Sequence, residues 1–167
     1  MECLFGKIED GEMQANLVGE MVGSEWKGLT ARFSQIDIDV WTVMPNHFHG
    51  IVMIIDNPER AMTSIARTGE PRVRPLIVRE NSSNGGKLHP VGTKEGSLGR
   101  IIQAFKSITT INYLGMLKES GIRSESGKLW HQNYYEHVIR TESDLAMIRE
   151  YIHYNPLKWE LDRFYKK

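Results

Sequence analysis

The sequence holds 167 residues, of which 40% are hydrophobic and 25% charged, and these values are typical of one soluble globular domain. The longest apolar run, at residues 51–55, is too short to span a membrane, and acidic residues near the start exclude the layout of a signal peptide. The single cysteine, Cys3, excludes an internal disulfide framework and is typical of a reducing compartment. We therefore expect a cytoplasmic protein that has no membrane association.

The net charge is zero, but it is unevenly distributed along the chain. Residues 1–55 hold three basic and eight acidic side chains, whereas residues 56–167 hold eighteen and thirteen. This asymmetry permits a polyanion to bind one side of the fold, although solvated surfaces often carry a similar excess.

The first third of the chain predicts a hairpin, a helix and two strands. Asp10-Gly11, between short mixed segments in residues 4–16, indicates a β-hairpin with a type I′ turn. Residues 17–32 carry apolar side chains at helical spacing, namely Leu17, Val18, Met21, Val22, Trp26 and Leu29. Residues 35–43 alternate apolar and polar side chains, with Ile36, Ile38 and Val40 set against Gln35, Asp37 and Asp39. The strand at residues 47–55 is expected to pair with it antiparallel across a Met-Pro-Asn corner.

Two histidines, His47 and His49, begin this second strand. Side chains at i and i+2 of a strand project from one face, so both imidazoles are aimed at one point and could hold a divalent metal. The pair is a weak signal alone, because two such histidines are equally often ordinary strand residues.

Residues 57–98 contain four prolines and several glycines without periodicity, and we expect a disordered or mobile insert. A helical pattern resumes at Ser97 and extends to about residue 118, with an apolar stripe formed by Leu98, Ile101, Ile102, Phe105, Ile108 and Ile111. Lys106, on the other side of this helix, is either a solvated lysine or a phosphate contact.

A strand at residues 134–140 and a helix at residues 141–155 complete the predicted order. Thr141 is a candidate N-cap, and Pro156 ends the helix. The order of hairpin, helix, two strands, helix, strand and helix, with no internal repeat, predicts a single α+β domain over residues 1–167 with an antiparallel sheet.

The last helix suggests a tyrosine next to the metal site. Leu145, Ile148 and Ile152 mark its core stripe, and at 100° per residue Asn155 lies near this stripe. Tyr151 borders the same face, whereas Tyr154 points away. A hydroxyl and a carboxamide four residues apart could both reach the histidine strand, although spacing alone favours a half-buried packing role for Tyr151.

Four segments together resemble a known family. Pro45-Asn-His-Phe-His-Gly-Ile-Val-Met-Ile54 is similar to the His-hydrophobe-His (HUH) motif of single-tyrosine transposases. It is followed in order by similar segments at residues 97–107, 130–140 and 148–159. The combination resembles the REP-associated tyrosine transposase branch of that family.

This resemblance implies a fold and a chemistry. It implies a ferredoxin-like central antiparallel sheet with helices mainly on one face. His47, His49 and Asn155 match the metal ligands, for Mg²⁺ or Mn²⁺, and Tyr151 matches the nucleophile that forms a 5′-phosphotyrosine with single-stranded DNA next to a hairpin. Arg100, Lys106 and Arg140 are candidate DNA contacts, and the expected state is a monomer or homodimer.

The match departs from the family at its start, because members usually have a further strand ahead of the segment that matches residues 2–6. We therefore expect the sheet to lack the family's first strand. Two alternatives stay open. One is a catalytically decayed or domesticated DNA-hairpin-binding protein, and the other is an unrelated zinc hydrolase that uses His-x-His.

Overall fold

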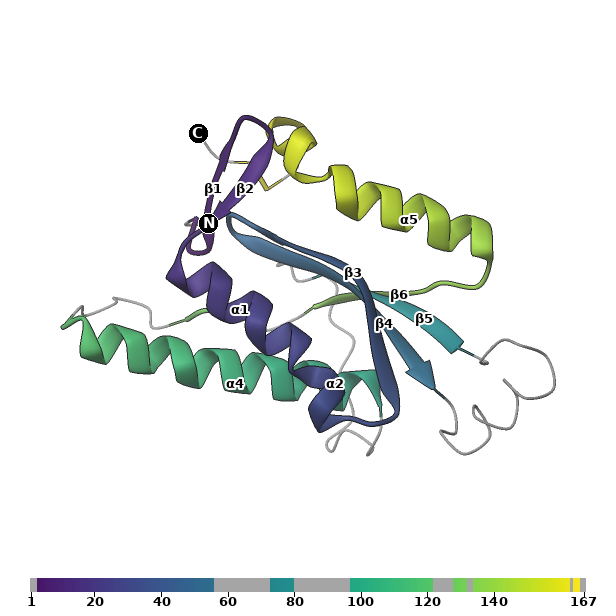
Figure 1. Cartoon of the computed structure of the whole chain (residues 1–167), viewed down its shortest axis with the longest axis horizontal. Helices are drawn as coiled ribbons and strands as arrows, with labels where there is room; N and C mark the ends of the chain where they lie inside the picture. Colours follow the sequence, from purple (N-terminus) through teal and green to yellow (C-terminus); the bar gives the residue numbers. More distant parts are fainter. Residues whose placement is uncertain are drawn as a thin grey trace.

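The computed structural model describes residues 3–55, 73–79, 97–121, 128–131, 134–162 and 164–165 (Figure 1). A hairpin of β1 (Gly6–Glu9) and β2 (Glu12–Ala15) precedes a four-stranded sheet in the order β3-β4-β5-β6. The strands of this sheet are β3 (Ile36–Met44), β4 (His47–Ile55), β5 (Val73–Arg79) and β6 (Tyr135–Val138). The helices are α1 (Leu17–Lys27), α2 (Leu29–Arg32), α4 (Leu98–Glu119), α5 (Glu142–Tyr154) and the 3-10 helix η1 (Pro156–Leu161).

All pairings within the described strands are antiparallel, which confirms the expected α+β class with an antiparallel sheet. The hairpin is also confirmed. Asp10 and Gly11 have φ angles of 52° and 78°, and a type I′ turn requires positive φ at both central residues.

The first helix is interrupted, so the prediction of one helix over residues 17–32 was wrong in its extent. Asn16 caps α1 because its side chain accepts hydrogen bonds from the backbone N–H groups of Val18 and Gly19, both at 3.0 Å. Gly28, a poor helix former, separates α1 from the single turn of α2.

A β-bulge in β3 changes which side chains share a face. Ile38 pairs with Val52 but Trp41 pairs with Gly50, so β3 has one more residue than β4 between these pairs. Val40 therefore packs against α5 rather than beside Ile36 and Ile38, and the predicted strict alternation was wrong at this residue.

Strand β5 lies inside residues 57–98, where we expected no regular structure. Val73–Arg79 pairs with β4 along its length, and its last four residues also pair with β6. Pro75 lies beyond the last β5–β6 pair, at Leu76, so its missing N–H removes no hydrogen bond between β5 and β6. Residues 97–98 of the predicted insert are the N-cap and the first residue of α4, and the rest of it lies outside the described residues.

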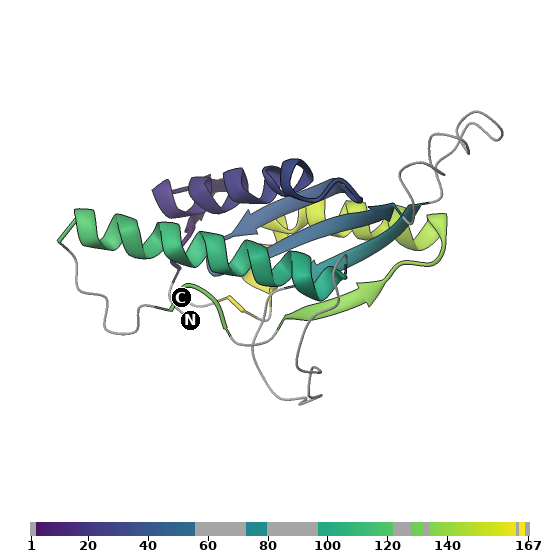
Figure 2. The ribbon, with the colours of Figure 1, turned by 90° about the horizontal axis from the view of Figure 1, so that it is seen from below.

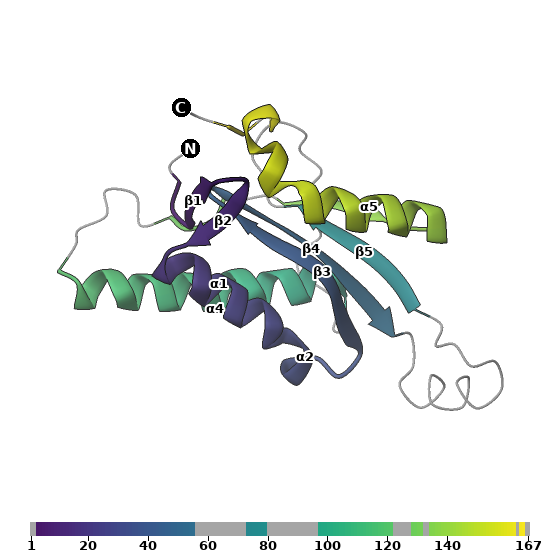
Figure 3. The same ribbon diagram turned by 45° about the horizontal axis from the view of Figure 1, so that its top comes forward.

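The helices cover both faces of the sheet (Figures 1 and 2). We expected helices mainly on one face of the sheet. Helices α1, α2 and α4 do lie on one face, where they share the larger core with β3 and β4. In contrast, α5 lies on the opposite face, as Figure 3 shows from above, and forms a small second core with β3 and β4. This second core consists of Ile51, Ile139, Leu145 and Ile152, flanked by Val40 and Ile148.

Candidate metal centre

Strand β4 places His47 and His49 on the face that α5 covers. The alternate residue, Phe48, points into the larger core, where its ring lies 4.7 Å from that of Trp26. Both histidines are buried, with 1% and 2% of their surface exposed. The predicted arrangement of two imidazoles on one face of the strand is therefore present.

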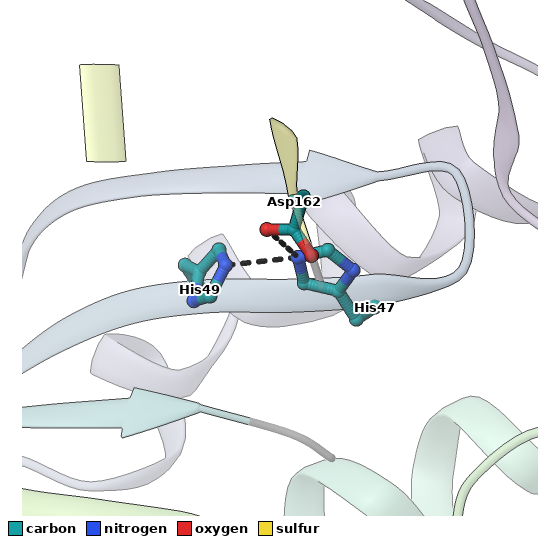
Figure 4. Close-up of side chains that lie close together, drawn as sticks. All are labelled: His47, His49 and Asp162. Atoms are coloured by element: carbon teal, nitrogen blue, oxygen red, sulfur yellow. Dashed lines mark hydrogen bonds and ion pairs between the residues drawn. The ribbon is translucent and has the colours of Figure 1, made fainter. Parts of the chain in front are cut away.

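The two imidazoles meet a carboxylate from the C-terminal segment (Figure 4). The Nε2 atoms of His47 and His49 are 2.9 Å apart, and Asp162 Oδ2 lies 3.9 Å from His47 Nε2. One ligand atom from each of the three residues lies within 4.8 Å of the others. This group could hold a metal ion, because imidazole nitrogen and carboxylate oxygen are common ligands of divalent metals.

Asp162 reaches the site because the chain turns back after η1. Its Oδ1 accepts a hydrogen bond from the backbone N–H of Phe164 at 2.8 Å, which leaves Oδ2 toward His47. The rings of Trp159 and Phe164 lie 5.9 Å and 5.2 Å from the His47 ring. The C-terminal segment thus supplies both a charge and aromatic walls that keep water from the imidazole.

Tyr151 lies beside the histidines, as its helical position predicted. Its ring meets that of His49 edge to face, with centroids 5.5 Å apart, and the side chain is 39% exposed. Tyr154 instead contacts the ring of His153, at 4.9 Å, on the outer side of α5. Tyr151 is therefore the tyrosine of α5 that combines proximity to the histidines with access to solvent.

Asn155 is buried at the C-terminus of α5, one turn after Tyr151, and is 3% exposed. Its backbone carbonyl accepts a hydrogen bond from the N–H of Lys158, at 3.1 Å, where η1 begins. A role as metal ligand stays a prediction, and the carboxylate of Asp162 is a second candidate for that place.

The predicted DNA contacts do not gather at the histidines. Arg100 and Lys106 belong to α4, on the opposite face of the sheet, and Lys106 Nζ donates to the carbonyl of His131 at 2.5 Å. Arg140 is exposed just before α5, whereas Tyr151 is in its last turn, so about 14 Å of helix, from Glu142 to Tyr151, lies between them.

Sequence reasoning missed three residues that build the site. Asp162 completes the group, Asn46 contacts His47, and Asp39 orients α5 by accepting from Arg149 Nε at 2.8 Å and from Nη2 at 2.7 Å. Only Asn46 had a local signal, since it precedes the first histidine. The other two act across more than a hundred residues and follow no spacing rule.

Comparison with known proteins finds a relative of this chain. An uncharacterized protein of Haemophilus influenzae is 35% identical over 164 residues, which are 98% of this chain and 78% of that protein. No family model and no solved structure matches the sequence. Among the described residues, no helix has both the length and the apolar character needed to cross a membrane. The chain belongs to the same family as this Haemophilus influenzae protein.

Proposed function

We propose that this protein is a single-tyrosine HUH transposase of the REP-associated branch, which cuts and rejoins single-stranded DNA next to a hairpin. One observation carries the proposal: Tyr151 on α5 lies against His49, in a site where two histidines and a carboxylate could hold a metal. The four similar sequence segments and the antiparallel sheet, for which we propose the ferredoxin-like arrangement, are consistent with it.

For the ion we propose Mg²⁺ or Mn²⁺. His47 and His49 would hold the ion together with Asp162 or Asn155. A bound divalent cation supplies charge that polarises a phosphate and orients it.

The residues of this chain then account for the strand cleavage. The phenol oxygen of Tyr151 attacks phosphorus, a Tyr–O–P bond forms, and the P–O3′ bond breaks. The phenol proton passes to solvent and the 3′ oxygen leaves as a hydroxyl. Because the 5′-phosphotyrosine keeps the energy of the phosphodiester, another 3′-hydroxyl can reverse the step and join strands without ATP.

The test is formation of a covalent adduct. The protein is incubated with hairpin-bearing single-stranded DNA, labelled at its 3′ end, and with Mn²⁺, and the products are separated under denaturing conditions. We expect a labelled protein band with the native protein and none with Tyr151→Phe, which loses only the attacking oxygen. Tyr154→Phe is the matched control, because Tyr154 is similarly exposed on the same helix and should keep the adduct.

Other outcomes point to the alternatives. DNA binding without an adduct would identify a decayed or domesticated hairpin-binding protein. The position of Asp162 is also compatible with a zinc hydrolase, because two histidines and one carboxylate are the ligands of some catalytic zinc sites. Zinc-dependent hydrolysis that survives Tyr151→Phe would favour that function. Loss of the adduct in Tyr154→Phe but not in Tyr151→Phe would refute the assignment of the nucleophile.

A further inference from the structure

We propose that Asn46 is a positioning residue that holds His47 as the Nδ1–H tautomer, and so turns its lone-pair nitrogen, Nε2, toward His49 and Asp162. The inference concerns how the chain prepares one ligand, and it rests on the metal centre of the proposed function. Asn46 and His47 are both buried, with 7% and 1% of their surface exposed.

The orientation of the Asn46 amide follows from its partner on the C-terminal segment. Its Nδ2 donates to the backbone carbonyl of Phe164 at 2.9 Å. A carbonyl oxygen can only accept, so a flipped amide would bring two oxygens together. The contact with Phe164 therefore fixes Oδ1 as the atom that faces His47.

The tautomer of His47 follows from this orientation. Asn46 Oδ1 lies 2.8 Å from His47 Nδ1, and because an amide oxygen only accepts, Nδ1 must carry the hydrogen. A neutral imidazole has one N–H, so its lone pair is on Nε2. That atom lies 2.9 Å from His49 Nε2 and 3.9 Å from Asp162 Oδ2, inside the group that could hold a metal.

A single turn of the C-terminal segment contacts two of the partners of His47. The N–H of Phe164 bonds Asp162 Oδ1, and the carbonyl of Phe164 accepts from Asn46. The turn thus directs the Asp162 carboxylate at His47 from one side, while Asn46 holds the ring from the other. Partners of this kind fix the ring and tautomer of a metal-binding histidine.

The tautomer can be read directly by nuclear magnetic resonance. Metal-free protein labelled with ¹⁵N-histidine is studied at pH 8, and the His47 signals are identified by their loss in His47→Ala. We expect a protonated Nδ1 and an unprotonated Nε2 in the native protein. In Asn46→Ala the hydrogen should move partly or wholly to Nε2, which neutral histidine favours when nothing holds it.

Asn46→Asp separates the proposed role from a general loss of structure. Its carboxylate still accepts from Nδ1–H, so the tautomer should be kept, although the hydrogen bond to Phe164 is lost. Thr109→Ala is the control for removing a buried polar group elsewhere, since Thr109 is fully buried in α4, and it should leave the His47 signals unchanged. An unchanged Nδ1–H tautomer in Asn46→Ala, or an Nε2–H tautomer in the native protein, would overturn the proposal. If Asn46→Ala does not fold, an Nε2–H signal in Asn46→Asp also overturns it.

A Mn²⁺ titration separates this inference from the proposed function. We expect Asn46→Ala to bind Mn²⁺ about ten-fold or more weakly, as is typical when a partner of a metal-binding histidine is removed. No Mn²⁺ binding by the native protein would refute the proposed metal centre, whereas the tautomer measurements would still decide the role of Asn46. Native binding that is unchanged in Asn46→Ala would refute the positioning role.

Discussion

Asp162 places a carboxylate next to two buried imidazoles, and its own side chain is only 8% exposed. A charge removed from water is costly unless it meets a counter-charge or hydrogen-bond donors. Asp162 has one backbone donor, from Phe164, and a bound cation would supply the counter-charge. Asn155 carries no charge, so a cation bound at this site would be attracted mainly by Asp162.

We therefore expect Asp162→Asn to weaken Mn²⁺ binding about ten-fold or more, because the amide keeps the shape and the acceptor but loses the charge. Glu160→Gln removes the same charge from an exposed position two residues away and should change the affinity little. Both can be measured by the loss of the free Mn²⁺ signal in electron paramagnetic resonance. Equal affinities in the two variants would leave Asn155 as the candidate third ligand.

Spacing rules could predict part of this site. His47, His49 and Tyr151 are positioned by the periods of a strand and a helix, so local sequence places them on the correct faces. Asp162 gives no such signal, because it lies in a charged segment and meets His47 only through a chain reversal after η1. A long-range contact of that kind depends on tertiary packing and is not encoded in a local period.

At the scale of elements, β4 contributes side chains to both layers, as β3 also does. His47, His49 and Ile51 face α5, whereas Phe48 and Val52 face α1 and α4. Gly50 lies on the face toward α1 and α4. A Cβ there would lie 2.5 Å from Cζ2 of Trp26 and 2.9 Å from Cε1 of Phe48. The glycine allows Trp26 to pack directly on the backbone of the strand that carries the histidines.

Gly50→Ala should therefore lower the free energy of unfolding by about 1–3 kcal/mol, because the added methyl overpacks a fully buried core. Gly115→Ala is the matched control, since a Cβ at this position of α4 meets no atom within 4 Å. There we expect stabilisation of about 0.4–1 kcal/mol, from helix propensity and a more restricted unfolded chain. Urea denaturation measures both, and equal effects would show that the Trp26 contact does not constrain Gly50.

Most elements could be predicted from sequence, and the exceptions have physical reasons. The Asp10-Gly11 turn and the Thr141 cap are local signals, and both are confirmed. Strand β5 was missed because residues 57–98 are rich in proline and glycine and show no periodicity, whereas pairing with β4 and β6 makes Val73–Arg79 a strand. The bulge at Asp39 and Val40 was missed because pairing with β4, rather than the pattern of β3 itself, defines it.

At the scale of the whole molecule, the two faces of the sheet differ in how they are stabilised. The face with α1 and α4 holds the large aromatic core, including Trp26, Phe48 and Phe105. Among the described residues, the α5 face holds a smaller apolar cluster, to which the Asp39–Arg149 ion pair is added. The histidines and the C-terminal segment lie on this face, so a bound ion would join β4 to the C-terminal segment.

We predict that Mn²⁺ stabilises the fold, because a bound ion would connect β4 to the C-terminal segment. At one hundred times its dissociation constant, an ion that binds only the native state contributes about 2.7 kcal/mol, which in a chain of this length raises Tm by about 5–10 °C. We expect this shift when Mn²⁺ replaces a chelator in a thermal melt followed by circular dichroism. The shift should be much smaller in His49→Ala and Asp162→Asn, and it should be kept in Glu160→Gln, which leaves the three candidate ligands intact. Equal melting temperatures with Mn²⁺ and with chelator, or an undiminished shift in His49→Ala, would mean that the ion does not connect β4 to the C-terminal segment.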